Sequence, residues 1–555
     1  MNFSFLLVGI NAKYIHSNPA IRSLKAYAGP EFAPYIRLSE YTINNHREDI
    51  LADIYRQKPS AIGISVYIWN VEMVRELIRD LGKVLPETEI YLGGPEVSYE
   101  SEHYLEMSNV RGIFIGEGEV TFKELISAYV AAWTAQSSLE ADTSDNAFIR
   151  QPNCNNMSSY LSDDILNSIK GLLTKNGYTG MQTPVSIDSL PFLYQVDNSG
   201  ESLLGDFENR IIYYESARGC PFRCSYCLSS IDKTTHFRSL ELVFKELDFF
   251  LENKVRQVKF IDRTFNCDAK RACQIWKHLI ANDNGVTNFH FEIAADILTD
   301  EEIEIIGQMR PGLVQLEIGV QTTNEETLRA INRPTSIPHL AEVVARLRAN
   351  NNVHIHLDLI AGLPYEDYAS FKRSFNDVFG MRPDQLQLGF LKVLNGAPIK
   401  AQAEEFGIRY TSDAPYEVLC TNFISYEEIR QLKNVEQMVE IFYNSAQFTQ
   451  TVPYLLSFFS TPFELFEALG KYYEENGLFV MTPARSRRYN IVLEFATGID
   501  GCDIEKLRDL LTLDYYLREK PKAKPDFVKN VPAEGLIDYG RRDPLTGNWG
   551  RFFCH

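Results

Sequence analysis

Hydrophobic runs alternate with amphipathic stretches along the first quarter of the chain. Strands are predicted where short apolar runs occur, at 3–10, 61–66, 89–92 and 112–115. Helices are predicted where apolar residues recur at helical spacing, near 17–27, 46–57, 71–85, 99–107 and 119–129. This alternation is typical of a doubly wound, mostly parallel sheet, whose ligands bind beyond the carboxyl ends of the strands.

The rest of the chain divides into three further parts. A polar stretch rich in Ser, Asn and Asp, residues 136–209, predicts a linker or insertion. Strand-like runs then recur between helical stretches, at 211–215, 257–261, 289–293, 313–318, 353–359 and 385–391. Six such units predict a partial, open (β/α)6 barrel over residues 210–413. Residues 414–555 are expected to be mostly helical, after a first α/β domain at 1–135.

Composition narrows the class of protein. The 555 residues carry a formal net charge of -19, which argues against extensive electrostatic binding of nucleic acid. We find no apolar run of membrane-spanning length and no cleavable leader, so we expect a soluble, cytoplasmic protein with no membrane association. Nine cysteines, an odd number spread over a long chain, do not resemble a disulfide framework.

Three of those cysteines stand close together, in a loop after the first barrel strand. Cys220, Cys224 and Cys227 have three and two residues between them. Converging thiolates suit an iron–sulfur or zinc centre, and three ligands would leave one iron of a four-iron cluster open. The alternatives are a zinc site, with His236 as the nearby fourth ligand, or three structural thiols.

The cysteine spacing, with an aromatic residue before the last cysteine, resembles the signature of radical S-adenosylmethionine (radical SAM) enzymes. The resemblance implies that the three cysteines bind a [4Fe-4S] cluster and that its free iron chelates S-adenosylmethionine. It also implies cofactor contacts from residues at or near the barrel strand ends, namely Tyr226, Asp262, Glu292, Glu317, Gln321 and Gly362. Any one of these carboxylates could instead form an ion pair at the barrel mouth, with Arg263 or Arg333 as its partner.

The first domain is similar to the cobalamin-binding domain that precedes the barrel in one branch of that family. The similarity lies in strand-end segments that would face the corrin: Ser65, Gly93, Gly94, Pro95, Gly116, Glu117, Gly118 and Glu119. The Asp-x-His-x-x-Gly motif that supplies a histidine to cobalt in other cobalamin proteins is absent, as is usual in this branch. We assign no cobalt role to His16. The alternative is a doubly wound domain that binds a nucleotide or nothing.

These resemblances imply an enzyme that cleaves S-adenosylmethionine reductively and methylates an unactivated carbon. The substrate would be an unknown small molecule or protein, and the electron donor a flavodoxin or ferredoxin. No catalytic residue is assigned. The open alternatives are a non-methylating rearrangement or cyclisation, a non-catalytic iron–sulfur sensor, and methylthiolation, although the domains that methylthiolation would require are not seen. The helical extension resembles that of an uncharacterised subgroup and is expected to cap the barrel mouth.

Overall fold

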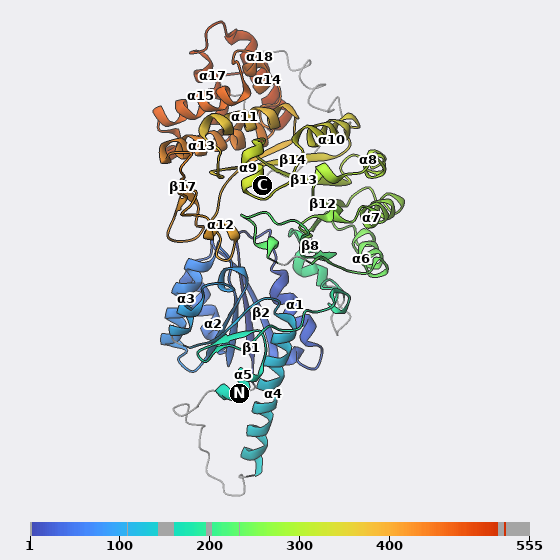
Figure 1. Ribbon diagram of the computed structural model, residues 1–555, viewed down its shortest axis with the longest axis vertical. Helices are drawn as coiled ribbons and strands as arrows, with labels where there is room; N and C mark the ends of the chain where they lie inside the picture. Colours follow the sequence, from blue (N-terminus) through green and yellow to red (C-terminus); the bar gives the residue numbers. More distant parts are fainter. Residues whose placement is uncertain are drawn as a thin grey trace.

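The computed structural model describes residues 3–107, 109–142, 160–195, 203–231, 234–519 and 527–528. Figure 1 shows three parts stacked along the longest axis. The N-terminal α/β domain lies at one end, the barrel in the middle, and the C-terminal helices at the other end. The predicted α/β class, with a parallel N-terminal sheet, a barrel and a helical C-terminus, is confirmed.

The first domain is built on a seven-stranded sheet in the order β2-β1-β3-β4-β5-β6-β7. Its parallel strands are β1 (Phe5–Asn11), β2 (Ile36–Thr42), β3 (Ala61–Ser65), β4 (Glu89–Gly93) and β5 (Val110–Phe114). Between them run the helices α1 (Pro19–Ala28), α2 (Arg47–Gln57) and α3 (Val71–Val84), and α4 (Glu119–Asp142) follows β5. Strand β1 is buried at every position, as expected for a central strand covered on both faces.

Three features of this domain differ from the predictions. Edge strand β2 was missed because only its first residue is buried and its pattern is mostly polar. The helix expected near 99–107 is a short 3₁₀ helix, Glu102–Glu106. Residues expected in the polar linker instead form α5 (Asp163–Ser168) and the antiparallel strands β6 (Leu172–Thr174) and β7 (Gly177–Tyr178). Strand β6 is buried because it covers the edge of β5, so the domain extends beyond residue 135.

The six predicted barrel strands all form, in the parallel order β15-β14-β13-β12-β11-β8. They are β8 (Ile212–Tyr214), β11 (Gln257–Phe260), β12 (Asn288–Ile293), β13 (Val314–Gln321), β14 (His354–Ala361) and β15 (Gln385–Phe390). The helices that connect them are α6 (Leu240–Glu252), α7 (Ala269–Ala281), α8 (Asp300–Gly307), α9 (Glu325–Ala330), α10 (Ile337–Ala349) and α11 (Tyr368–Gly380). Between β8 and α6, a two-stranded ribbon pairs β9 (Ala217–Arg218) with β10 (His236–Phe237).

The C-terminal part begins with a correction. Within the stretch expected to be mostly helical, Val418–Cys420 is instead strand β17, paired with β16 (Arg409–Tyr410) after the short helix α12 (Pro398–Ala401). The following helices are α13 (Tyr426–Val439) with a π-helical end (Glu440–Asn444), α14 (Thr451–Leu456), α15 (Pro462–Glu475), α16 (Leu478–Met481), α17 (Arg487–Ala496) and α18 (Ile504–Arg518).

These helices cover the open edge of the barrel sheet. Asn444 accepts a hydrogen bond from the Leu386 N–H at 2.9 Å and donates one to the Leu386 carbonyl at 2.8 Å, as a neighbouring strand would. Helix α15 packs against α11 beside this edge. An exposed edge strand is a template for unwanted pairing, so the cover is a physical requirement of an open barrel. The expected role of the extension as a cap over the barrel mouth stays a prediction.

No described helix is both long and apolar enough to cross a membrane.

Candidate functional site

The three cysteines of the loop line one cavity of about 200 Å³ at the carboxyl ends of the barrel strands. Cys220 and Cys224 are buried and Cys227 is half-buried. The cavity is also lined by four residues predicted to contact the cofactor, namely Tyr226, Glu292, Glu317 and Gln321. His236 does not line this cavity, so the residue named as a fourth zinc ligand does not join the thiols.

The shape of the loop depends on a glycine at its start. Gly219 has a φ of +95°, and a Cβ on it would lie 2.0 Å from the carbonyl oxygen of Thr234. The close approach of these two backbones lets β9 and β10 pair at the base of the loop. Within the loop, the Ser225 N–H donates to the Ile331 carbonyl at 2.9 Å. The ribbon therefore closes the base of the loop, and the Ser225–Ile331 hydrogen bond fixes its centre against the barrel.

Two polar residues that line the cavity fit a bound cofactor. Gln321 adopts a φ of +73° at a bulge that ends β13, and backbone strain of this kind gathers at functional sites. Its Oε1 is buried and has no hydrogen-bond partner among the described residues. Arg333 Nη1 donates to Cys224 Sγ at 3.5 Å, which places a cation beside a cysteine that would ligate as a thiolate. An unpaired acceptor and a thiolate-stabilising cation suit a cluster that binds a polar cofactor.

Carboxylates form the floor of the cavity, on neighbouring strands. Glu292 on β12 lies opposite Glu317 on β13. Glu317 Oε2 is 3.1 Å from Lys259 Nζ and 2.8 Å from His290 Nε2. Although burial opposes ionisation, His290 and Lys259 hold the pKa of Glu317 well below its usual range. Burial, together with the charge of Glu317, raises the pKa of Glu292.

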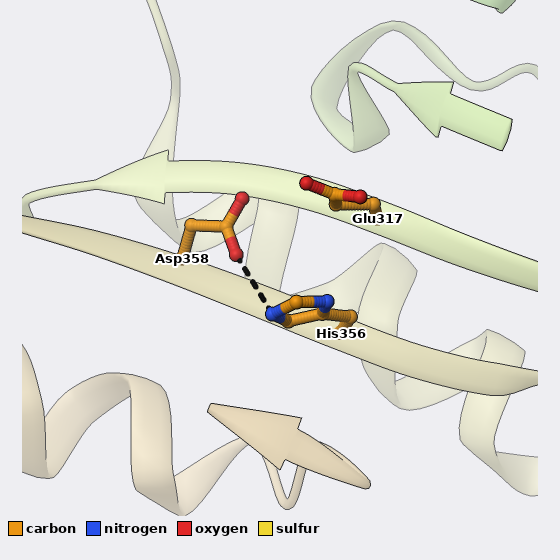
Figure 2. Close-up of side chains that lie close together, drawn as sticks. All are labelled: Glu317, His356 and Asp358. Carbon is orange, nitrogen blue, oxygen red and sulfur yellow. Dashed lines mark ion pairs between the residues drawn. The ribbon is translucent and has the colours of Figure 1, made fainter. Parts of the chain in front are cut away.

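The polar cluster continues onto β14, whose His356 and Asp358 lie close to Glu317 of β13 (Figure 2). His356 Nε2 is 3.1 Å from Asp358 Oδ1, and burial lowers the pKa of His356 to about 4. Burial also raises the pKa of Asp358 well above its usual range. The three residues could offer ligands to a metal ion. However, the Lys259 ammonium already pairs with Glu317, so the chain supplies its own cation here.

Two of the predicted contact residues are placed elsewhere. Asp262 is buried and does not line the cavity; it accepts hydrogen bonds from Ser216 N, Ser216 Oγ and Ala217 N. It therefore supports the backbone that leads into the cysteine loop. Gly362 also lies off the cavity, and a Cβ on it would meet the side chain of Val418 at 2.6 Å. Its small size is required by packing against β17.

Behind the strained end of β13, a buried carboxyl makes stability depend on pH. Glu366 accepts hydrogen bonds from Thr322 Oγ1 at 2.6 Å and Ser374 Oγ at 2.9 Å. Burial raises the pKa of Glu366 from 4.5 to about 7. Between these values the folded state keeps a proton that the unfolded state releases, so stability falls as pH rises.

We expect Glu366→Gln to remove this dependence, because the amide carries no charge to bury. Two and a half pH units correspond to on the order of 3 kcal/mol, so the variant should gain thermal stability over the wild type as pH rises from 5 to 8. Thermal unfolding at several pH values measures this gain, with the exposed Glu404→Gln as control. Parallel curves for the wild type and Glu366→Gln would contradict the assignment.

A second, larger cavity of about 780 Å³ lies at the strand ends of the first domain. All eight residues predicted to face a corrin line it: Ser65, Gly93, Gly94, Pro95, Gly116, Glu117, Gly118 and Glu119. Gly94 has a φ of +115°, and a Cβ there would lie 2.4 Å from the Val66 carbonyl oxygen. The wall between β3 and β4 can therefore be built only of bare backbone at this point, which fits close approach of a bulky ligand.

The cysteine loop closes this second cavity, which sequence reasoning missed. Leu228, Ile231, Thr234 and His236 follow Cys227 and line the larger cavity. No local motif marks them, because their role depends on how the barrel meets the first domain. His16, to which no cobalt role was assigned, does not line either cavity; its Nδ1 lies 2.5 Å from the Tyr213 hydroxyl of the barrel.

Comparison with known families divides the chain in the same way. Residues 6–126 match the B12 binding domain, and residues 214–378 match the radical SAM superfamily. Residues 404–536 match a family described as a protein of unknown function, DUF4080. The matched ranges cover the first α/β domain, most of the barrel and the helical extension.

Several characterised proteins are similar to this chain. The cobalamin-dependent radical SAM methyltransferase TokK of Streptomyces tokunonensis is 21% identical over 63% of this chain and 50% of TokK. The 2-(S-pantetheinyl)-carbapenam-3-carboxylate methyltransferase of Streptantibioticus cattleyicolor is 23% identical over 57% of this chain and 44% of that protein. The chain thus spans about half the length of these curated relatives.

Among solved structures, the cobalamin-dependent S-adenosylmethionine radical enzyme OxsB with aqua-cobalamin bound has a similar fold. The TM-score is 0.60 at 14% identity, over 92% of this chain and 79% of OxsB. Each family match covers one domain, whereas this similarity of fold also covers the arrangement of the domains in one chain. The chain contains a radical SAM superfamily domain, which it joins to an N-terminal B12 binding domain and a C-terminal DUF4080 region.

Proposed function

We propose that this protein is a cobalamin-dependent radical SAM enzyme that methylates an unactivated carbon of its substrate. One observation carries the proposal: a single loop lines both cavities, with Cys220, Cys224 and Cys227 on one side and Leu228, Ile231, Thr234 and His236 on the other. Two cofactors bound in these cavities would be neighbours. The names of the two methyltransferase relatives support methyl transfer over a non-methylating reaction.

The smaller cavity suits a cluster with S-adenosylmethionine. Three thiolates would ligate three irons and leave the fourth open. S-adenosylmethionine carries a sulfonium and an ammonium group, and Glu292, Glu317 and Asp358 present carboxyl groups to that space. Gln321 offers its unpaired Oε1 as a further acceptor. The reduced cluster, when bound, supplies the electron that cleaves the cofactor, and the buried walls keep water from the reacting atoms.

The larger cavity suits the corrin. Glycines 93, 94, 116 and 118 let the strand ends approach it closely, and the aliphatic Leu228 and Ile231 face it from the barrel side. Neither His16 nor an Asp-x-His-x-x-Gly segment is proposed as a cobalt ligand. We propose an unidentified small molecule or protein as the substrate, and a flavodoxin or ferredoxin as the reductant.

Anaerobic reconstitution of the full chain with iron, sulfide and hydroxocobalamin tests the proposal. We expect iron and corrin to remain bound after gel filtration. With S-adenosylmethionine and dithionite, 5′-deoxyadenosine should form. Bound corrin and iron without any 5′-deoxyadenosine would favour the non-catalytic sensor, and the absence of bound corrin would remove the methyl-transfer proposal.

A further inference from the structure

One arginine joins the cysteine loop to the first domain. Arg218 ends β9 and precedes Gly219 and Cys220. Its Nη1 lies 3.2 Å from Glu117 Oε1, and its Nη2 lies 3.0 Å from Glu119 Oε1. Both glutamates line the larger cavity. The Arg218 side chain, close in sequence to the first cluster cysteine, therefore forms ion pairs with the strand-end segment that would face the corrin.

The same guanidinium is held from the barrel side. Arg218 Nε donates to Glu215 Oε1 at 2.9 Å, and Nη2 donates to Glu215 Oε2 at 2.8 Å. Three carboxylates thus converge on one planar cation that can donate to all of them at once. The Glu119 side chain is only 8% exposed, so its charge depends on this partner more than a surface charge would. Without Arg218, the carboxylates of the two domains would repel one another.

Backbone pairing between β9 and β10 also connects Arg218 to the larger cavity. In the ribbon, Arg218 pairs with His236, and His236 and Thr234 line the larger cavity. Movement of β9 would thus move the cysteines on one side and the corrin-facing wall on the other. Other contacts across the same boundary would persist, including Arg210 Nη1 to Glu40 Oε2 at 3.1 Å and Tyr416 to Glu96.

We propose that Arg218 is a positioning residue that fixes the separation between the cluster and the corrin by clamping the cysteine loop to Glu117 and Glu119. The inference rests on the proposed function, since it assumes that both cofactors bind. The clamp acts through the protein backbone, and Arg218 itself lines neither cavity.

Arg218→Met and Arg218→Lys test the clamp in the reconstituted full-length protein. Methionine removes all three ion pairs, whereas lysine keeps the charge but lacks the fork that reaches three carboxylates. Arg210→Met is the matched control, because it removes an arginine–glutamate pair across the same boundary while Glu40 keeps Arg22 as a partner. Iron content, the dissociation constant for hydroxocobalamin, and the dipolar interaction between reduced cluster and cob(II)alamin by pulsed EPR are measured.

For Arg218→Met we expect unchanged iron content, cobalamin binding weakened about tenfold, and a broader distribution of cluster–cobalt distances. Arg218→Lys should fall between Arg218→Met and the wild type, and Arg210→Met should match the wild type. If Arg218→Met does not fold, Arg218→Lys alone decides by the width of its distance distribution. Wild-type distances and affinity in the Arg218 variants would overturn the clamp alone, whereas a wild-type protein without corrin would overturn the proposed function as well.

Discussion

Replacing Cys224 with alanine is expected to abolish 5′-deoxyadenosine formation and most of the iron binding. A four-iron cluster with one open iron needs three protein thiolates, and this variant supplies only two. Cys224 also accepts a hydrogen bond from Arg333, so the change leaves that half-buried cation without its sulfur partner. Iron analysis and product detection after anaerobic reduction measure both effects.

Cys502→Ala is the matched control, because Cys502 is a partly buried thiol in the C-terminal helical region, remote in sequence from the loop. This variant should retain wild-type iron and turnover. Circular dichroism and gel filtration of both variants separate loss of the cluster from loss of the fold. A Cys224→Ala protein with full iron and full product would exclude the three-cysteine site.

Replacing Gly219 with alanine should weaken both cofactor sites together, while the rest of the fold persists. The residue would have to keep a positive φ, at a cost of about 1–3 kcal/mol, with its Cβ against the Thr234 carbonyl. Because the Thr234 oxygen belongs to the backbone and cannot rotate away, β9 and β10 must separate. We expect reduced iron content and reduced hydroxocobalamin binding in the same protein.

Gly285→Ala controls for the backbone conformation alone. Gly285 also has a positive φ, +73°, but nothing lies within 4 Å of the Cβ position. It should cost about 1 kcal/mol of stability and leave both cofactors bound. If Gly219→Ala lost iron but bound cobalamin normally, the shared dependence of the two sites on the ribbon would be wrong.

The strand ends of the first domain and the cysteine triplet could be located from sequence because each depends on a local signal. Glycines at 93, 94, 116 and 118 follow apolar runs, and parallel strands bring such segments to one edge. The structure places all of them along one cavity, although their contact with cobalamin stays a prediction. The same reasoning placed Glu292, Glu317 and Gln321 around the cysteines.

Other features depend on contacts that no local pattern records. Asp262 follows a strand as a cofactor ligand would, but its burial and its bonds to Ser216 and Ala217 give it a supporting position. His356 and Asp358 are two residues apart on β14, and their importance appears only once β13 brings Glu317 beside them. Likewise, β6 was missed in a polar stretch because a strand of three residues is too short to show a periodic pattern.

The two hydrogen bonds between Asn444 and Leu386 limit how the DUF4080 region can be studied. If the chain were cut before Tyr426, β15 would present a free row of amide and carbonyl groups, the surface from which neighbouring molecules stack into aggregates. Loss of turnover in such a truncated protein would report insolubility rather than any part the helices play in choosing a substrate. Point changes on their outer faces are the informative route.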